Sequence, residues 1–210
     1  MNSDRMSSLW HGIQAEFPLL VGVFPFGLIY GVSALHAGMT PGLAQSMSSI
    51  VFAGSAQFIT AQLIHESAPA MVIVLSIGIV NLRHMLYSAS VAPYVRHLST
   101  GWKALLAYLL TDEAYAAVIV HFEKRGVTPT GHWYFLGAGA SLWLTWQLST
   151  ALGIFLGAAI PASWPLEFAL PLTFTAMLIP MLKYKAIVAA SLASAAVSLL
   201  AAYLPYKLGL

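Results

Sequence analysis

Long apolar runs recur along the whole of this 210-residue chain, and they constrain its fold more than any other feature. A run of roughly 20 residues is the length that an α-helix needs to cross the hydrocarbon core of a bilayer. Hydrophobic residues make up 59% of the chain and charged residues only 8%, a balance that ordinary soluble domains do not have. We therefore expect an all-α, polytopic transmembrane helix bundle that forms one integral membrane domain over residues 1–210.

The apolar runs divide into about seven segments, which follow a short polar N-terminus at residues 1–17. The segments are residues 18–38, 42–64, 68–94, 101–122, 132–159, 166–182 and 184–204. Pro25 and Gly27 predict an interruption of the first segment, because proline removes a backbone donor. The small residues Gly54-Ser55-Ala56 predict an interruption of the second, since an unwound backbone is tolerated in a membrane where it is buried or lines a cavity.

Two motifs with glycines four residues apart predict close contacts between helices. They are Gly27-x-x-x-Gly31 and Gly153-x-x-x-Gly157. Small residues at this spacing form a flat stripe along a helix, so that a second helix backbone can approach closely. We interpret both motifs as packing sites only.

Four ionisable residues interrupt the apolar runs. Arg83 and His84 are predicted in the middle of one membrane helix, and Asp112 and Glu113 in the middle of the next. Both pairs are equally far from the loop at 95–101, so antiparallel helices would bring the opposite charges to the same depth. A lone charge at the bilayer centre costs ~2.5–3.5 kcal/mol on insertion scales, so such residues are rare, usually paired and usually functional. The alternative is a structural ion pair that fixes helix register, but that role would not need His84 and Glu113 as well.

Four further polar residues lie within apolar segments: Ser55, Gln57, Asn81 and Gln147. Gln57 and Asn81 are equally far from the turn near residues 66–68, which predicts similar depths on adjacent helices. The structural alternative is an interhelical hydrogen bond, worth ~0.6–2 kcal/mol. We expect these four residues to belong to the same polar site as the ionisable groups.

Composition and motifs exclude several classes of function. The net charge of +2 is small and scattered, which argues against binding to nucleic acid, and the absence of cysteine excludes iron–sulfur clusters and cysteine nucleophiles. The sequence contains no P-loop, dinucleotide fingerprint or nucleophile elbow, and no set of metal ligands. We therefore expect no enzyme activity, no metal and no cofactor.

The distribution of basic residues favours a cytoplasmic N-terminus by the positive-inside rule. With seven spans, more Lys and Arg residues fall on the N-terminal side of the membrane than on the other. The basic residues on the N-terminal side are Arg5, Lys124, Arg125, Lys183 and Lys185. Those on the opposite side are Arg96, Lys103 and Lys207.

The polar landmarks occur in an ordered series that resembles the AzlC family of branched-chain amino acid permeases. The series is residues 52–58 (FAGSAQF), 81–87 (NLRHMLY), 110–113 (LTDE) and 146–148 (WQL). The resemblance covers most of the chain, and its first two motifs are long and specific. It implies a protein of the bacterial inner membrane that exports branched-chain amino acids together with a small membrane subunit of the AzlD type.

Valine, leucine and isoleucine are zwitterions with apolar side chains, so a site within the membrane must neutralise both charges. We assign the substrate carboxylate to Arg83, helped by backbone amides near Gly54-Ser55-Ala56, and the ammonium to Asp112 or Glu113. Hydrogen bonds that orient the substrate are assigned to Gln57, Asn81 and Gln147. Proton or ion coupling is assigned to His84 together with whichever of Asp112 and Glu113 is not engaged by substrate.

Two other functions stay open at the level of sequence. The first is a channel for small solutes, which would show no saturable exchange. The second is a structural subunit of a membrane complex, in which Arg83 and Asp112 would only hold the helices in register.

Overall fold

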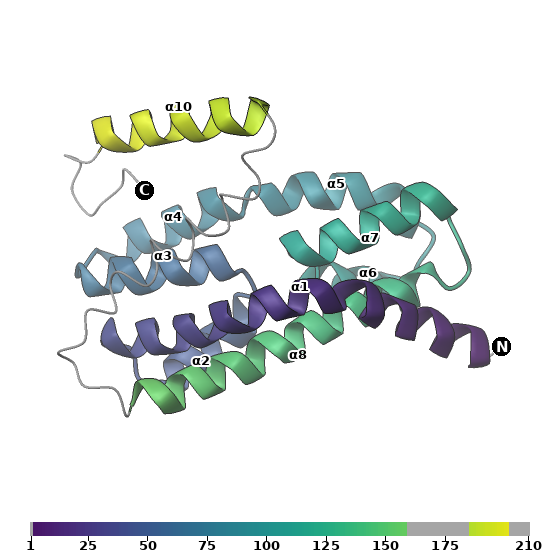
Figure 1. Ribbon diagram of the computed structural model, residues 1–210, viewed down its shortest axis with the longest axis horizontal. Helices are drawn as coiled ribbons and strands as arrows, with labels where there is room; N and C mark the ends of the chain where they lie inside the picture. Colours follow the sequence, from purple (N-terminus) through teal and green to yellow (C-terminus); the bar gives the residue numbers. More distant parts are fainter. Residues whose placement is uncertain (1, 159–184, 202–210) are drawn as a thin grey trace.

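The computed structural model describes residues 2–158 and 185–201, and every regular element in these ranges is an α-helix (Figure 1). The all-α part of the predicted fold is therefore confirmed. The predicted segment 166–182 lies outside the described residues. The helices are α1 (Asn2–His36), α2 (Pro41–Ile50), α3 (Gly54–His65), α4 (Ala70–Asn81), α5 (Arg83–Val95), α6 (Thr100–Tyr108), α7 (Asp112–Arg125), α8 (Gly131–Gly157) and α10 (Lys185–Ala201).

Helices α1 and α8 are the two longest and lie side by side along the molecule (Figure 1). A Cβ atom built on Gly31 would lie 2.7 Å from the backbone nitrogen of Ile154, and one on Gly153 would lie 2.8 Å from the carbonyl carbon of Leu28. The two backbones therefore touch where both helices carry glycine. Both glycine motifs make helix contacts, as predicted, because a side chain at these positions would hold the helices apart.

Helix α1 is continuous from Asn2 to His36, so the predicted interruption at Pro25 and Gly27 is wrong. Proline removes one backbone donor, which an otherwise well-packed helix can tolerate. The packing at this point is close: a Cβ atom on Gly27 would lie 3.1 Å from the Cβ of Ser149 on α8. The polar residues 2–17 form the first turns of the same helix.

The predicted interruption of segment 42–64 is present, between α2 and α3. Thr40 accepts a hydrogen bond from the backbone N–H of Leu43 at 3.3 Å and precedes a proline at the first helical position, which are two signals for the start of α2. Helix α2 ends at Ile50, and α3 begins at Gly54 without a side-chain cap. The residues between them, 51–53, are extended or irregular.

Asp112 and Glu113 lie at a helix start, so the prediction that they lie in mid-helix is wrong, whereas Arg83 and His84 lie near the middle of the apolar stretch Ala70–Val95, as predicted. Helix α7 begins at Asp112 after a break at residues 109–111 that divides segment 101–122. Carboxylates in a first turn are stabilised by the positive end of the helix dipole, which explains why the helix begins here. Helix α5 begins at Arg83 after a milder break, because Leu82 keeps helical backbone angles (φ −55°, ψ −28°).

Two stretches of the described chain are long and apolar enough to cross a membrane, Ser3–His36 and Ala70–Val95. No residue of α4 is buried, although that helix is almost entirely apolar. Large side chains such as Val74 and Ile79 are about two-thirds exposed, which is the surface expected for contact with lipid. The expected count of seven spans is not established, because segments 42–64 and 101–122 are each divided into two short helices.

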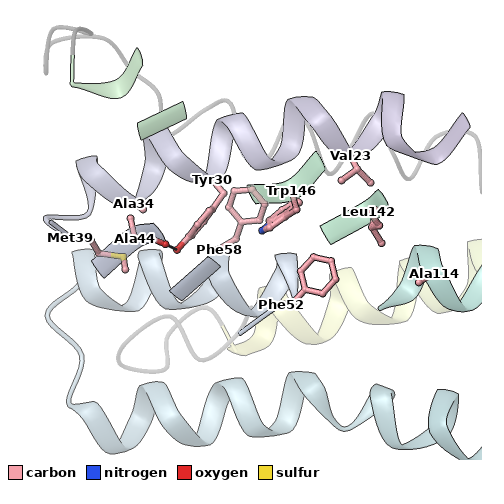
Figure 2. Close-up of a cluster of buried hydrophobic side chains, with 10 residues drawn as sticks. All are labelled: Val23, Tyr30, Ala34, Met39, Ala44, Phe52, Phe58, Ala114, Leu142 and Trp146. Carbon is pink, nitrogen blue, oxygen red and sulfur yellow. Dashed lines mark hydrogen bonds between the residues drawn. The ribbon is translucent and has the colours of Figure 1, made fainter. Parts of the chain in front are cut away.

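A cluster of buried side chains, several of them aromatic, packs between α1, α2, α3 and α8 beside the break between α2 and α3 (Figure 2). Tyr30 is fully buried at its centre and donates a hydrogen bond to the backbone oxygen of Ala44 at 3.1 Å. Phe58 lies edge-on to Tyr30 and Trp146 stacks on it, with ring centroids 5.9 and 6.3 Å away. This cluster fixes the start of α3 relative to the long helices.

Candidate functional site

A cavity of about 440 Å³ lies between the starts of α3, α5 and α7 and the long helices α1 and α8. Its volume is within the range of about 300–1,000 Å³ that small-molecule sites occupy. Its wall is apolar on α1 and α8 and polar at the three helix starts. The polar residues that line it are Ser55, Arg83, His84, Thr111, Asp112 and Glu113.

Three helices begin at this cavity, at Gly54, Arg83 and Asp112. The first backbone N–H groups of a helix have no partner within the helix, and they carry partial positive charge. No side chain caps the start of α3 or of α7. The arrangement therefore favours an anionic group in the cavity, and the start of α3 has no acidic residue to supply one.

An ion pair connects the three helix starts. The Nη1 of Arg83 donates to the Oδ2 of Asp112 at 2.5 Å, and its Nη2 donates to the Oγ of Ser55 at 2.5 Å. The two charged side chains are 31% and 38% exposed, so a molecule in the cavity can reach them. The predicted approach of the opposite charges is confirmed.

The polar cluster keeps unused hydrogen-bonding capacity. Among the residues that the structure describes, the Nε of Arg83 and the Oδ1 of Asn81 are buried without a hydrogen-bond partner. The Nδ1 of His84 lies 3.2 Å from the backbone oxygen of Asn81, where α4 ends. Buried polar atoms are rarely left unpaired, so these two atoms mark a place where a ligand would add hydrogen bonds.

The opposite wall of the cavity is aromatic and aliphatic. Phe26 from α1, Phe52 and Phe58 beside the break, and Leu142 and Trp146 from α8 line it. In Figure 2 the side chains of Phe58 and Trp146 lie next to each other, and those of Phe52 and Leu142 lie farther along the cluster, toward Ala114. The cavity therefore joins a compact charged region to an apolar region, which suits a small molecule that is charged at one end and apolar at the other.

Gln57 does not line this cavity. It is fully buried, its Nε2 donates to the backbone oxygen of Val51 at 2.6 Å, and its Oε1 accepts from the Nε1 of Trp146 at 3.1 Å. Val51 lies in the break between α2 and α3, and its carbonyl also accepts a hydrogen bond from the backbone N–H of Ala53 at 2.8 Å. Gln57 thus adds a second hydrogen bond to a carbonyl in the break and connects it to α8.

Gln147 makes a similar connection farther from the cavity. Its Oε1 accepts from Gln45 and Ser49 of α2, both at 2.8 Å, and its Nε2 donates to the backbone oxygen of Ser48 at 3.1 Å. Of the predicted site residues, Ser55, Arg83, His84, Asp112 and Glu113 come together at the cavity. Asn81 lies beside them, and the two glutamines hold the broken helix against α8.

Sequence reasoning missed Glu16, which it placed in the polar N-terminus. Glu16 lies within α1 and is fully buried. Gly12, one helical turn earlier, contacts the backbone of α8, so spacing of four residues places Glu16 on the packed face of α1. This spacing was the signal that could have found it.

Comparison with known proteins agrees with the resemblance in the landmark motifs. The family model for the AzlC protein matches residues 18–160, which is more than half of the chain. The chain belongs to the AzlC family. The matched range contains every residue that lines the polar side of the cavity.

Three relatives illustrate the spread of this family. The inner membrane protein YgaZ of Escherichia coli strain K12 is 25% identical over 185 residues, which cover 85% of this chain and 75% of YgaZ. An uncharacterized membrane protein of Archaeoglobus fulgidus is 27% identical, over 87% of this chain and 80% of its own. The branched-chain amino acid transport protein AzlC of Bacillus subtilis strain 168 is 24% identical, over 75% of this chain and 62% of its own. No solved structure matches the chain.

Proposed function

We propose that this AzlC-family member is a membrane transporter that exports branched-chain amino acids from the cytoplasm across a bacterial inner membrane. The observation that carries the proposal is the cavity in which the Arg83–Asp112 ion pair faces a wall of aromatic side chains. Family membership supports it, as does the Bacillus subtilis relative, which is named as a branched-chain amino acid transport protein. The resemblance adds a small AzlD-type membrane subunit as the expected partner.

A zwitterion can enter this ion pair without leaving a charge unpaired. The substrate carboxylate takes the place of Asp112 on the guanidinium of Arg83, beside the uncapped start of α3. The substrate ammonium then meets the released Asp112 carboxylate, with Glu113 next to it. Because each charge exchanges one partner for another, the cost of breaking a pair in a poorly solvated site is offset.

The apolar side chain of the substrate fits the other wall. In the proposed pose it lies among Phe26, Phe58 and Trp146, which line the cavity opposite the ion pair. Burial of a Val, Leu or Ile side chain contributes roughly 1.5–3 kcal/mol, so this wall favours branched aliphatic substrates over glycine or alanine. Asn81, which has an unpaired oxygen beside the cluster, is proposed to orient the ammonium.

The divided helices are the parts that we expect to move during transport. Helices α3, α5 and α7 start at the cavity, while α1 and α8 contact each other through glycine along their length. Broken helices that begin at a substrate site are a recurring feature of secondary transporters. We infer that the short helices rearrange against the α1–α8 pair, and that Gln57 and Gln147 preserve the break while they do so.

The test is counterflow of labelled valine in proteoliposomes, with this chain alone and with a small AzlD-type subunit. Saturable exchange is expected in the wild type, and Arg83→Ala should abolish it at equal abundance in the membrane. Arg96→Ala is the matched control, because Arg96 lies exposed after the last turn of the same helix and should be dispensable.

Two results would overturn the proposal. Uptake without saturation or counterflow would indicate a channel. Wild-type exchange in Arg83→Ala would leave the ion pair with only a structural role.

A further inference from the structure

Glu16 is a buried carboxylate that the substrate site does not use. Its relative exposure is 0%, and neither of its carboxylate oxygens has a hydrogen-bond partner among the residues that the structure describes. Complete burial without a partner is unusual for an acidic residue, which is almost never fully enclosed unless it is paired. Glu16 therefore needs an explanation of its own.

The enclosure around Glu16 is made by helix packing. A Cβ atom on Gly12, one turn earlier on the same face of α1, would lie 3.0 Å from the backbone nitrogen of Ala138 on α8. Gly137 on α8 lies equally close to α1, since a Cβ there would be 2.9 Å from the carbonyl carbon of Leu9. Glu16 thus follows a close backbone contact between α1 and α8.

No cationic side chain of the described residues is hydrogen-bonded to Glu16. Glu113 of α7 and Tyr134 of α8 are close enough to interact with it electrostatically. Helix α2 carries no titratable residue, and α3 carries only His65 at its C-terminal end. Helix α7 also carries His121, whose ring stacks on that of Tyr134 with centroids 3.7 Å apart, and Arg125, but neither is a hydrogen-bond partner of Glu16.

An unpaired carboxylate in such a place is expected to carry a proton. The cost of burying an isolated charge is so high that a group in this position neutralises instead. A second carboxylate nearby further favours the protonated form of Glu16, because two negative charges at short distance repel each other. Glu113 lines the cavity, so this second carboxylate also connects Glu16 to the place where substrate would bind.

We propose that Glu16 is a proton-binding residue that couples a proton to transport. It holds a proton in the arrangement described, and it exchanges that proton with Glu113. In the exchange the carboxylic acid of Glu16 gives its proton to the Glu113 carboxylate, so Glu16 becomes a carboxylate and Glu113 an acid. Glu113 lines the cavity and there exchanges this proton with the solution, and a substrate ammonium beside Glu113 stabilises its charged form, so that the proton is then held by Glu16. This coupling rests on the proposed function, whereas the bound proton does not.

The bound proton can be tested in the full-length protein without substrate. Infrared spectroscopy in detergent at neutral pH resolves the carbonyl stretch of a protonated carboxylic acid, which shifts on deuteration. We expect Glu16→Gln to lose one such band, and the control Glu123→Gln, which alters an exposed carboxylate on α7, to keep it. An unchanged spectrum in Glu16→Gln would overturn the proposal.

A second variant keeps the test informative if Glu16→Gln folds poorly. Glu113→Gln leaves the contact between α1 and α8 intact and removes the neighbouring carboxylate. The Glu16 band should then remain and change frequency, whereas an unaltered band would refute the interaction.

Coupling is read from valine efflux with and without an imposed pH gradient. The gradient should change the rate in the wild type and Glu123→Gln but not in Glu16→Gln, and an equal response in all three would refute coupling. If the wild type shows no counterflow while the infrared band is present, the proposed function fails and the proton site stands.

Discussion

The contact between α1 and α8 predicts that Gly31→Ala destabilises the protein, although alanine favours helices. A Cβ atom at Gly31 would lie 2.7 Å from the nitrogen of Ile154 and 2.9 Å from the carbonyl carbon of Gly153. Both are backbone atoms inside α8, so they cannot move aside as a flexible side chain would. One helix must shift, and overpacking of this kind costs about 1–3 kcal/mol.

Gly78→Ala is the matched control, because a Cβ atom at Gly78 of α4 has nothing within 4 Å. Both substitutions gain the same helix propensity, up to about 1 kcal/mol relative to glycine. The propensity term therefore cancels when the two variants are compared, and their difference isolates the overpacking cost. That difference of about 1–3 kcal/mol corresponds to roughly 2–12 °C in melting temperature for a chain of this size.

The assay is thermal unfolding of both variants and the wild type in the same detergent, followed by tryptophan fluorescence. We expect Gly78→Ala to melt at or slightly above the wild type, and Gly31→Ala to melt clearly below Gly78→Ala. If Gly31→Ala melts at the temperature of Gly78→Ala or above it, the close approach of the two backbones is refuted.

Three further predictions concern the cavity and the helix break. The double variant Arg83→Asp, Asp112→Arg should recover part of the melting temperature that either single reversal loses. It should not recover valine counterflow, because the start of α3 still favours an anion where the variant places Asp. Restored counterflow would indicate that the ion pair is purely structural. Gly22→Val should fold normally, since a Cβ at Gly22 has nothing within 4 Å, yet narrow the cavity that Gly22 lines. In competition assays it should disfavour leucine more than alanine, and an unchanged preference would argue against this cavity as the substrate site. Gln57→Leu leaves the Trp146 indole N–H unpaired, whereas the Val51 carbonyl keeps its hydrogen bond from the N–H of Ala53, so the variant should lose about 1–3 kcal/mol in thermal unfolding; a variant as stable as the wild type would contradict this role.

Features that depend on one local pattern could be predicted from the sequence. The glycines at 31 and 153 indicated helix contacts because only small residues permit backbones to touch. Opposite charges equally far from a loop indicated a pair, since antiparallel helices place such positions at equal depth. The small residues near Gly54 indicated the break between α2 and α3.

Features in which two local signals compete were predicted wrongly. The apolar run 101–122 favours one long helix, whereas Thr111 followed by two acidic residues is also typical of a helix start. Apolar length alone predicts one helix over this run, whereas the structure begins α7 at Asp112. At Pro25 the local pattern predicts a break in the helix. The structure keeps α1 continuous there, because α1 packs against α8.

The separation of Arg83 and Asp112 along the chain has a consequence for biosynthesis. The two residues are 29 positions apart, so Arg83 is synthesised well before its partner. At roughly 5–20 residues per second the delay is about 1–6 s. During that time the apolar stretch Ala70–Val95 must carry an unpaired arginine into the membrane, at a cost of ~2.5–3.5 kcal/mol. The uninterrupted apolar sequence of α4 is therefore what permits the nascent chain to insert before the ion pair exists.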